Sequence, residues 1–140
     1  MIIEERIYTL HASAELSEFL HIYETEGLPV QKPILGGFLG YFTSMFGTLN
    51  QVVHWWAYAD LNDRSDRRDR LHKEPQWLAI LPKLRPMLKE MESKIMAPVH
   101  FSPIRTLPVE FGEENTAFSG KAPADLASFG EPEVSQTFWR

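Results

Sequence analysis

Four stretches of the chain predict β-strands, because their apolar residues follow a strand-like pattern. They are residues 2–10, 38–45, 51–58 and 90–101, with Pro98 suiting the end of a strand. The second and third stretches flank a turn at residues 46–50. Gly47 can adopt a positive φ there, and Asn50 tolerates turn geometry. These two strands are therefore predicted to form a β-hairpin whose loop is longer than the tightest kind.

Apolar residues at helical spacing predict two helical regions, one after the first strand and one before the last. In the first region, Ser13 is expected to cap the helix and Gly27 to end it, with Pro29 following shortly after. Residues 29–34 could add one more helical turn. The apolar stripe of this region is Leu16, Phe19, Leu20 and Tyr23.

The second helical region, residues 62–88, predicts two or three short helices rather than one long one. Pro75 suits the first position of a helix, whereas Pro82 and Pro86 would each kink or end one. The apolar stripe of this region is Trp77, Ile80, Leu81 and Leu84.

Three glycines, Gly36, Gly37 and Gly40, precede or open the second strand. A phosphate-binding loop would need a helix N-terminus after them, and here a strand follows. Close approach of two backbones, or a β-bulge, is the preferred interpretation.

The order β-α-β-β-α-β predicts an α+β, ferredoxin-like fold with a four-stranded antiparallel sheet and helices on one face. Residues 51–58 are bulky and mostly apolar on both faces of their strand, with Trp56 on one and Trp55 on the other. One tryptophan must therefore lie on the face without helices. Soluble monomers seldom expose such a patch, so we expect a symmetric homodimer, or a higher homo-oligomer, that stacks these faces.

Composition divides the 140 residues into two parts. Residues 1–105 carry 12 basic and 13 acidic side chains and hold the predicted domain. Residues 106–140 carry 2 basic and 6 acidic side chains and lack any helical or strand period. This second part is either a solvated tail or an arm that anchors on the body or on a neighbouring subunit. We favour the arm, because its sequence contains Phe111, Phe118, Phe129, Phe138 and Trp139.

Charge and hydropathy exclude several classes of partner. The chain lacks the basic patch expected of a nucleic-acid-binding protein. It also lacks an apolar run of the roughly 18–20 residues that span a membrane, and an evident signal peptide. With no cysteine in the sequence, a reducing, cytoplasmic location is expected.

Several short motifs, in order over about 100 residues, resemble the NIPSNAP family of the dimeric α+β barrel superfamily. They include Glu4-x-Arg6-x-Tyr8, Leu35-Gly36-x-x-Leu39-Gly40, Gly47-x-Leu49-Asn50-x-Val52-Val53-His54-x-Trp56-x-Tyr58, Arg64-x-x-x-Arg68, Pro75-x-Trp77, and Lys94-Ile95-x-x-Pro98 with Phe101-Ser102-Pro103. The resemblance implies a ferredoxin-like subunit and a dimer whose two sheets close into a barrel. It implies little chemistry, although related barrels include cofactor-free monooxygenases, isomerases and haem-binding enzymes. The segment from Thr106 lies outside the family pattern.

Two sets of side chains are candidates for a ligand site, because the ferredoxin-like order makes their strands central neighbours. Strand periodicity places Glu4, Arg6 and Tyr8 on one face of residues 2–10. It places His54, Trp56 and Tyr58 on one face of residues 51–58. His54 could transfer protons, Arg6 could stabilise an anionic oxygen and Glu4 could orient either. The aromatic rings of Tyr8, Trp56 and Tyr58 would stack on a planar ligand.

A structural interpretation competes with each of these roles. Glu4, Arg6 and Tyr58 could simply satisfy one another as buried pairs, and His54 could be a hydrogen-bonded core residue. Arg64 and Arg68 lie four residues apart on a helix, near Asp60 and Asp63. Ion pairing at the exposed helix end is the preferred role for these arginines, and an anion site is the alternative.

No metal or cofactor is expected, because the remaining histidines lack ligand spacing. They are His11, His21, His72 and His100. We therefore predict a small organic ligand in the cleft of the barrel, with proton transfer or cofactor-free oxygenation if the protein is an enzyme. The alternative is a non-catalytic assembly module that uses the C-terminal arm.

Overall fold

The computed structural model describes residues 1–107. They fall within a first compact unit, Met1–Val109. The predicted boundary at residue 105 lies close to the end of this unit. The arm predicted for residues 106–140, with all of its aromatic residues, lies outside the described residues except for its first two positions, so its role stays a prediction.

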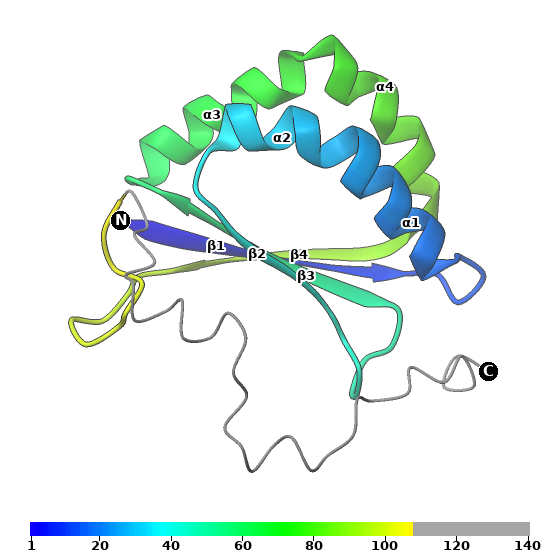
Figure 1. Cartoon of the computed structure of the whole chain (residues 1–140), viewed down its shortest axis with the longest axis horizontal. Coiled ribbons are helices and arrows are strands. Elements are labelled where there is room, and N and C mark those ends of the chain that lie inside the picture. Colours follow the sequence, from blue (N-terminus) through cyan, green and yellow to red (C-terminus); the bar gives the residue numbers. More distant parts are fainter. Residues whose placement is uncertain (108–140) are drawn as a thin grey trace, which may run out of the picture. The chain divides into compact units, whose positions relative to one another are not determined.

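Four antiparallel strands form one sheet with helices on one face, which confirms the predicted α+β ferredoxin-like class (Figure 1). The strands are β1 (Ile2–Leu10), β2 (Phe38–Thr43), β3 (Gln51–Tyr58) and β4 (Leu88–Met96). Their order is β2-β3-β1-β4, so β1 and β3 are the central pair. The last strand begins and ends earlier than predicted, because its pairing with β1 stops at Met96, before Pro98.

The first helical region contains the additional turn predicted for residues 29–34, but it continues into that turn without a break. It comprises α1 (Leu16–Ile22), a π-helical turn η1 (Tyr23–Gly27) and α2 (Leu28–Leu35). Gly27 does not end the helix, because it keeps a right-handed φ of −76° and packs against Tyr23 and Trp77. The helix ends instead at Gly36, whose φ is +63°. The predicted Ser13 cap is also wrong, since the N-cap residue is Glu15 and no side chain caps this end.

The second helical region contains α3 (Leu61–Lys73), α4 (Pro75–Leu84) and a 3₁₀ turn η2 (Arg85–Met87), as the proline pattern predicted. Pro82 does not end the helix, because α4 continues for two residues beyond it. Proline has no amide N–H to donate to the carbonyl of Leu78, and Leu78 is 47% exposed.

Close backbone approach explains Gly37, as the glycine pattern predicted. Its carbonyl accepts a hydrogen bond of 2.7 Å from the amide of Ala57. A Cβ atom on Gly37 would lie 2.0 Å from the carbonyl oxygen of Ala57. The pairing of β2 with β3 also shifts between Phe38 and Gly40, which is the irregularity expected of a bulge.

Strand register places the two candidate sets on the same face of the sheet. Glu4 pairs with Trp56 and Arg6 pairs with His54 across β1 and β3. Residues directly opposite each other in antiparallel strands point to the same side, and here that side is the one covered by the helices. The alternate residues of these strands, together with Phe42 of β2, lie on the open face. None of the helices within residues 1–107 is long and apolar enough to cross a membrane.

Candidate functional site

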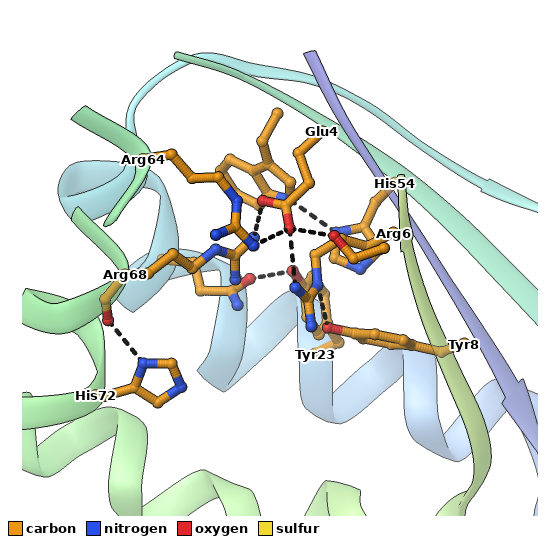
Figure 2. Close-up of polar contacts among 11 residues, drawn as sticks. Glu4, Arg6, Tyr8, Tyr23, His54, Arg64, Arg68 and His72 are labelled. Atoms are coloured by element: carbon orange, nitrogen blue, oxygen red, sulfur yellow. Dashed lines mark hydrogen bonds and ion pairs between the residues drawn. The ribbon is translucent and has the colours of Figure 1, made fainter. Parts of the chain in front are cut away.

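A fully buried carboxylate, that of Glu4, is the centre of the site (Figure 2). Its Oε1 accepts hydrogen bonds from Arg6 Nη1 at 3.0 Å, Arg64 Nη2 at 2.6 Å and Ser93 Oγ at 2.7 Å. Its Oε2 accepts one from Arg68 Nη2 at 2.9 Å. We call these five residues the Glu4 cluster. They come from β1, α3 and β4, so the cluster joins the helical layer to the sheet.

The Glu4 cluster has more positive than negative charge. Burial alone would raise the pKa of Glu4, but the hydrogen bonds from Arg64 and Ser93 and the charges of Arg68 and Arg6 hold it well below its usual range. The carboxylate is therefore ionised at neutral pH, and it offsets one of three guanidinium charges. A surplus of two positive charges remains in a partly buried environment, where an anion would be attracted strongly.

The structure corrects the role preferred for Arg64 and Arg68. The side chain of Arg68 is only 10% exposed and that of Arg64 is 25% exposed, and both bond to Glu4 rather than to Asp60 or Asp63. The predicted pairing at the helix end is made by Arg67, whose Nε lies 2.6 Å from Asp63 Oδ1. The reason is the packing of α3, which turns the 64–68 face of the helix toward β1.

A cavity of about 220 Å³ lies beside the Glu4 cluster, between the sheet and the helices. Ligand sites for drug-sized molecules usually measure about 300–1,000 Å³, so this cavity suits a smaller molecule. Its polar wall consists of Arg6, Tyr8, Arg64, Arg68, His72 and Arg85. The rest of its lining is apolar or aromatic and includes Phe19, Tyr23, Leu71, Trp77, Leu81, Leu84, Leu88 and Met91.

Four of the predicted site residues line this cavity, namely Arg6, Tyr8, Arg64 and Arg68. The other four do not line it. Glu4 is fully buried and bonds to the arginines, and His54, Trp56 and Tyr58 are fully buried in the core. Sequence reasoning missed His72, Arg85 and Trp77 as lining residues. For His72 a signal existed, because positions 64, 68 and 72 follow one another at intervals of four on a single helix face.

His54 occupies an aromatic environment behind the cavity. Its ring stacks on Tyr41 at a centroid distance of 4.8 Å and meets Tyr8 edge-on at 4.9 Å. Its Nδ1 accepts a hydrogen bond of 2.7 Å from Trp56 Nε1, so the proton of the neutral ring is on Nε2. Burial, with the charges of Arg6 and Arg68, lowers the pKa of His54 to about 3. This neutral ring has no free lone pair, and the geometry does not support the proton-transfer role predicted for it.

His72 and Tyr8 differ from His54, because each has hydrogen-bonding capacity that no contact among the described residues uses. His72 Nδ1 lies 2.8 Å from the carbonyl oxygen of Arg68. A carbonyl oxygen only accepts, so Nδ1 donates and Nε2 of the neutral ring keeps its lone pair. Tyr8 Oη accepts a hydrogen bond of 2.8 Å from Arg6 Nε, which leaves its own O–H to donate elsewhere.

The fold and the site define a class of protein, a ferredoxin-like α+β protein with an arginine-lined cavity between sheet and helices. The family model described as NIPSNAP matches residues 3–103, and the chain belongs to the NIPSNAP family, as the sequence motifs predicted.

Solved structures of this family are similar over most of the described chain. A NIPSNAP family protein from Agrobacterium tumefaciens is 41% identical with a TM-score of 0.72, over 74% of this chain and 98% of the other. A NIPSNAP-like domain protein from Burkholderia xenovorans is 46% identical with a TM-score of 0.70, over 73% and 88%. A protein from Nitrosomonas europaea assigned to the antibiotic biosynthesis monooxygenases shares the fold alone, at 10% identity and a TM-score of 0.53, over 71% and 100%.

Curated relatives match a shorter part of the chain. Protein NipSnap homolog 2 of Mus musculus is 39% identical over 67 residues, which is 48% of this chain and 24% of the relative. The matching part of this chain thus spans only about a quarter of such a relative, and the activity of the whole relative does not transfer.

Proposed function

We propose that this protein binds a small organic anion, with a carboxylate as its charged group, in the cavity beside the Glu4 cluster. The observation that carries this proposal is the surplus of guanidinium groups over carboxylate on one wall of the cavity. Arginine suits carboxylates because its planar fork can donate two parallel hydrogen bonds. Each of the three arginines donates one hydrogen bond to Glu4, so other guanidinium N–H groups remain for a ligand.

The apolar part of the lining supports an organic rather than an inorganic anion. Phe19, Trp77 and Leu84 are almost fully buried and face the same cavity as the arginines. A ligand with a carboxylate at one end and a compact apolar or aromatic body at the other would satisfy both walls. Cofactor-free oxygenation of such a molecule stays a prediction, because a shared fold does not carry a reaction.

Isothermal titration calorimetry with phenylacetate and its neutral amide, phenylacetamide, tests the proposal. The two molecules have nearly the same shape, and only the first carries charge. We expect phenylacetate to bind at least about tenfold more tightly, since charge-assisted hydrogen bonds to arginine are lost in the amide. Equal affinity for the two probes, or binding of neither, would refute an anion site.

A matched pair of arginine variants locates the site. Arg85 lines the cavity, is exposed and makes no ion pair within residues 1–107, so its removal should leave the fold intact. We expect Arg85→Ala to weaken phenylacetate binding by up to about fivefold, in line with about 1 kcal/mol for an exposed charge pair. Arg70→Ala removes an exposed arginine of α3 that does not line the cavity, and it should bind as the unaltered protein does.

We also propose that the protein is a homodimer that pairs the open faces of two sheets. Ile7, Val53, Trp55 and Phe42 lie on this face, and Phe42 is 49% exposed. A second copy would bury this apolar group and would give the barrel expected from the sequence. An assembly role for the C-terminal arm and a cytoplasmic location stay predictions.

A further inference from the structure

We infer that the cavity catalyses reversible proton removal from the carbon next to the carbonyl of a small 2-oxo acid, with His72 as the base and Tyr8 as the donor to the oxygen. This inference rests on the proposed binding of organic carboxylates in the cavity. It adds a substrate class and assigns two residues to the reaction.

The tautomer of His72 provides the base. The Nδ1–H of His72 donates to the carbonyl oxygen of Arg68, with 2.8 Å between Nδ1 and the oxygen, and the lone pair therefore lies on Nε2. His72 lines the cavity, and Figure 2 shows its ring beneath the arginines, well away from Glu4. His72 is also an exposed residue, so a proton taken up there can exchange with water.

Tyr8 provides a donor on the other side of the same space. Figure 2 shows its hydroxyl directed toward Arg6, across from the ring of His72. The hydroxyl oxygen accepts from Arg6 Nε, so its proton points away from the guanidinium and is available to a ligand oxygen. A positive group held against a tyrosine hydroxyl also strengthens that hydroxyl as a donor to developing negative charge.

The charge of the Glu4 cluster matches the product of the first step. A 2-oxo acid enters as a monoanion. When its C3–H bond breaks, the proton moves to His72 Nε2, the electron pair forms the C2–C3 double bond, and the carbonyl π electrons move to oxygen. The resulting enolate carries two negative charges, and the cluster has a surplus of two positive charges. Return of a proton to C3 regenerates the acid, so the reaction needs no oxidant or co-reactant.

Proton NMR in deuterium oxide tests the inference with phenylpyruvate as the probe, because its ring suits the apolar wall. We expect the protein to accelerate loss of the C3–H signal over protein-free buffer. His72→Gln should still bind phenylpyruvate in calorimetry but should lose exchange by roughly a hundredfold, the usual contribution of a general base. His21→Gln, which removes an exposed histidine outside the cavity, should exchange as the unaltered protein does.

Further readouts separate a chemical role from a structural one. Free imidazole should restore exchange to His72→Ala, and Tyr8→Phe should slow exchange more than it weakens binding. If phenylpyruvate binds without accelerated exchange, or if His72→Gln exchanges at the normal rate, the inference is overturned while anion binding stands. If neither phenylacetate nor phenylpyruvate binds, the proposed function fails and the inference fails with it.

Discussion

Glu4 shows how one residue can tie a layer of helices to a sheet. Its carboxylate accepts hydrogen bonds from three arginines, two of which belong to α3. We expect Glu4→Gln to lower the free energy of unfolding by about 3 kcal/mol or more, because three partly buried guanidinium groups would lose the counter-charge that they share. Urea unfolding followed by circular dichroism measures this loss.

The matched control for Glu4 is Asp63, whose ion pair with Arg67 on α3 is more exposed, with side-chain exposures of 24% and 32%. Asp63→Asn should cost less than about 1 kcal/mol, as is usual for exposed pairs. Similar losses in the two variants would show that the Glu4 cluster contributes no more than a surface ion pair.

His54 predicts a pH dependence of stability. Its pKa is about 3 in the folded chain, against an ordinary value of 6.5. Below pH 6.5 the unfolded chain therefore binds a proton that the folded chain does not, and stability falls as the pH falls. Between pH 7 and pH 5 this single group should account for about 2 kcal/mol of the loss.

The variant His54→Gln keeps an acceptor for Trp56 and cannot titrate, so it should lose most of that pH dependence. His21→Gln, at an exposed position, should keep it. Urea midpoints measured at pH 7, 6 and 5 give the slopes directly. A slope that is unchanged in His54→Gln would mean that the ring is protonated in the folded protein as readily as in the unfolded one.

At the scale of elements, Gly37 fixes the junction between α2 and β2. Its φ is +34°, and an added Cβ would meet the carbonyl oxygen of Ala57 on β3. We expect Gly37→Ala to destabilise the protein by about 3 kcal/mol or more, because backbone atoms of a central strand cannot move aside. Thermal and urea unfolding both report the change.

Gly47, at the tip of the β2–β3 hairpin, is the control for Gly37. A substitution there tests the cost of a positive φ without a collision between the added Cβ and other atoms. Its φ is +85°, but nothing lies within 4 Å of an added Cβ. Gly47→Ala should therefore cost only the left-handed conformation, about 1–2 kcal/mol. An equal cost at the two glycines would contradict the collision with Ala57.

The sequence predicted the strands better than the helix ends, and the reason is physical. A period of two identifies both faces of β1 and β3, and opposite pairing then brings Glu4 and Arg6 onto the same face as His54. Gly27 carries a local signal for a helix end, yet packing against Trp77, fifty residues later in the sequence, overrides it. Local signals cannot anticipate such a contact.

The candidate site was predictable only in part for the same reason. The spacing of Arg64 and Arg68 shows that they share a helix face, but not which way that face turns. Their contact with Glu4 joins residues 60 and 64 positions apart, and it depends on how α3 packs over β1. The cavity depends on the same packing. The spacing of His72 with Arg64 and Arg68 indicates a shared helix face but no cavity, and Arg85 had no signal in the sequence.

At the scale of the whole molecule, the proposed homodimer depends on the open face of the sheet. Ile7 lies near its centre, opposite Val53 on one side and Glu92 on the other. We expect the protein to have the mass of two chains in light scattering at micromolar concentration. Ile7→Lys should give the mass of one chain, because a lysine there would have to bury its charge between the two sheets.

The control for Ile7→Lys adds the same charge to the helical layer. Leu78 is 47% exposed on α4, so Leu78→Lys should leave the dimer unchanged. The melting temperature of a dimer rises with protein concentration, because association stabilises the folded chain by mass action. This dependence should persist in Leu78→Lys and vanish in Ile7→Lys, so that a loss of pairing is distinguished from a loss of folding. A mass of one chain for the unaltered protein would instead leave Trp55 and Phe42 on a solvent-facing sheet, and the homodimer would have to be abandoned.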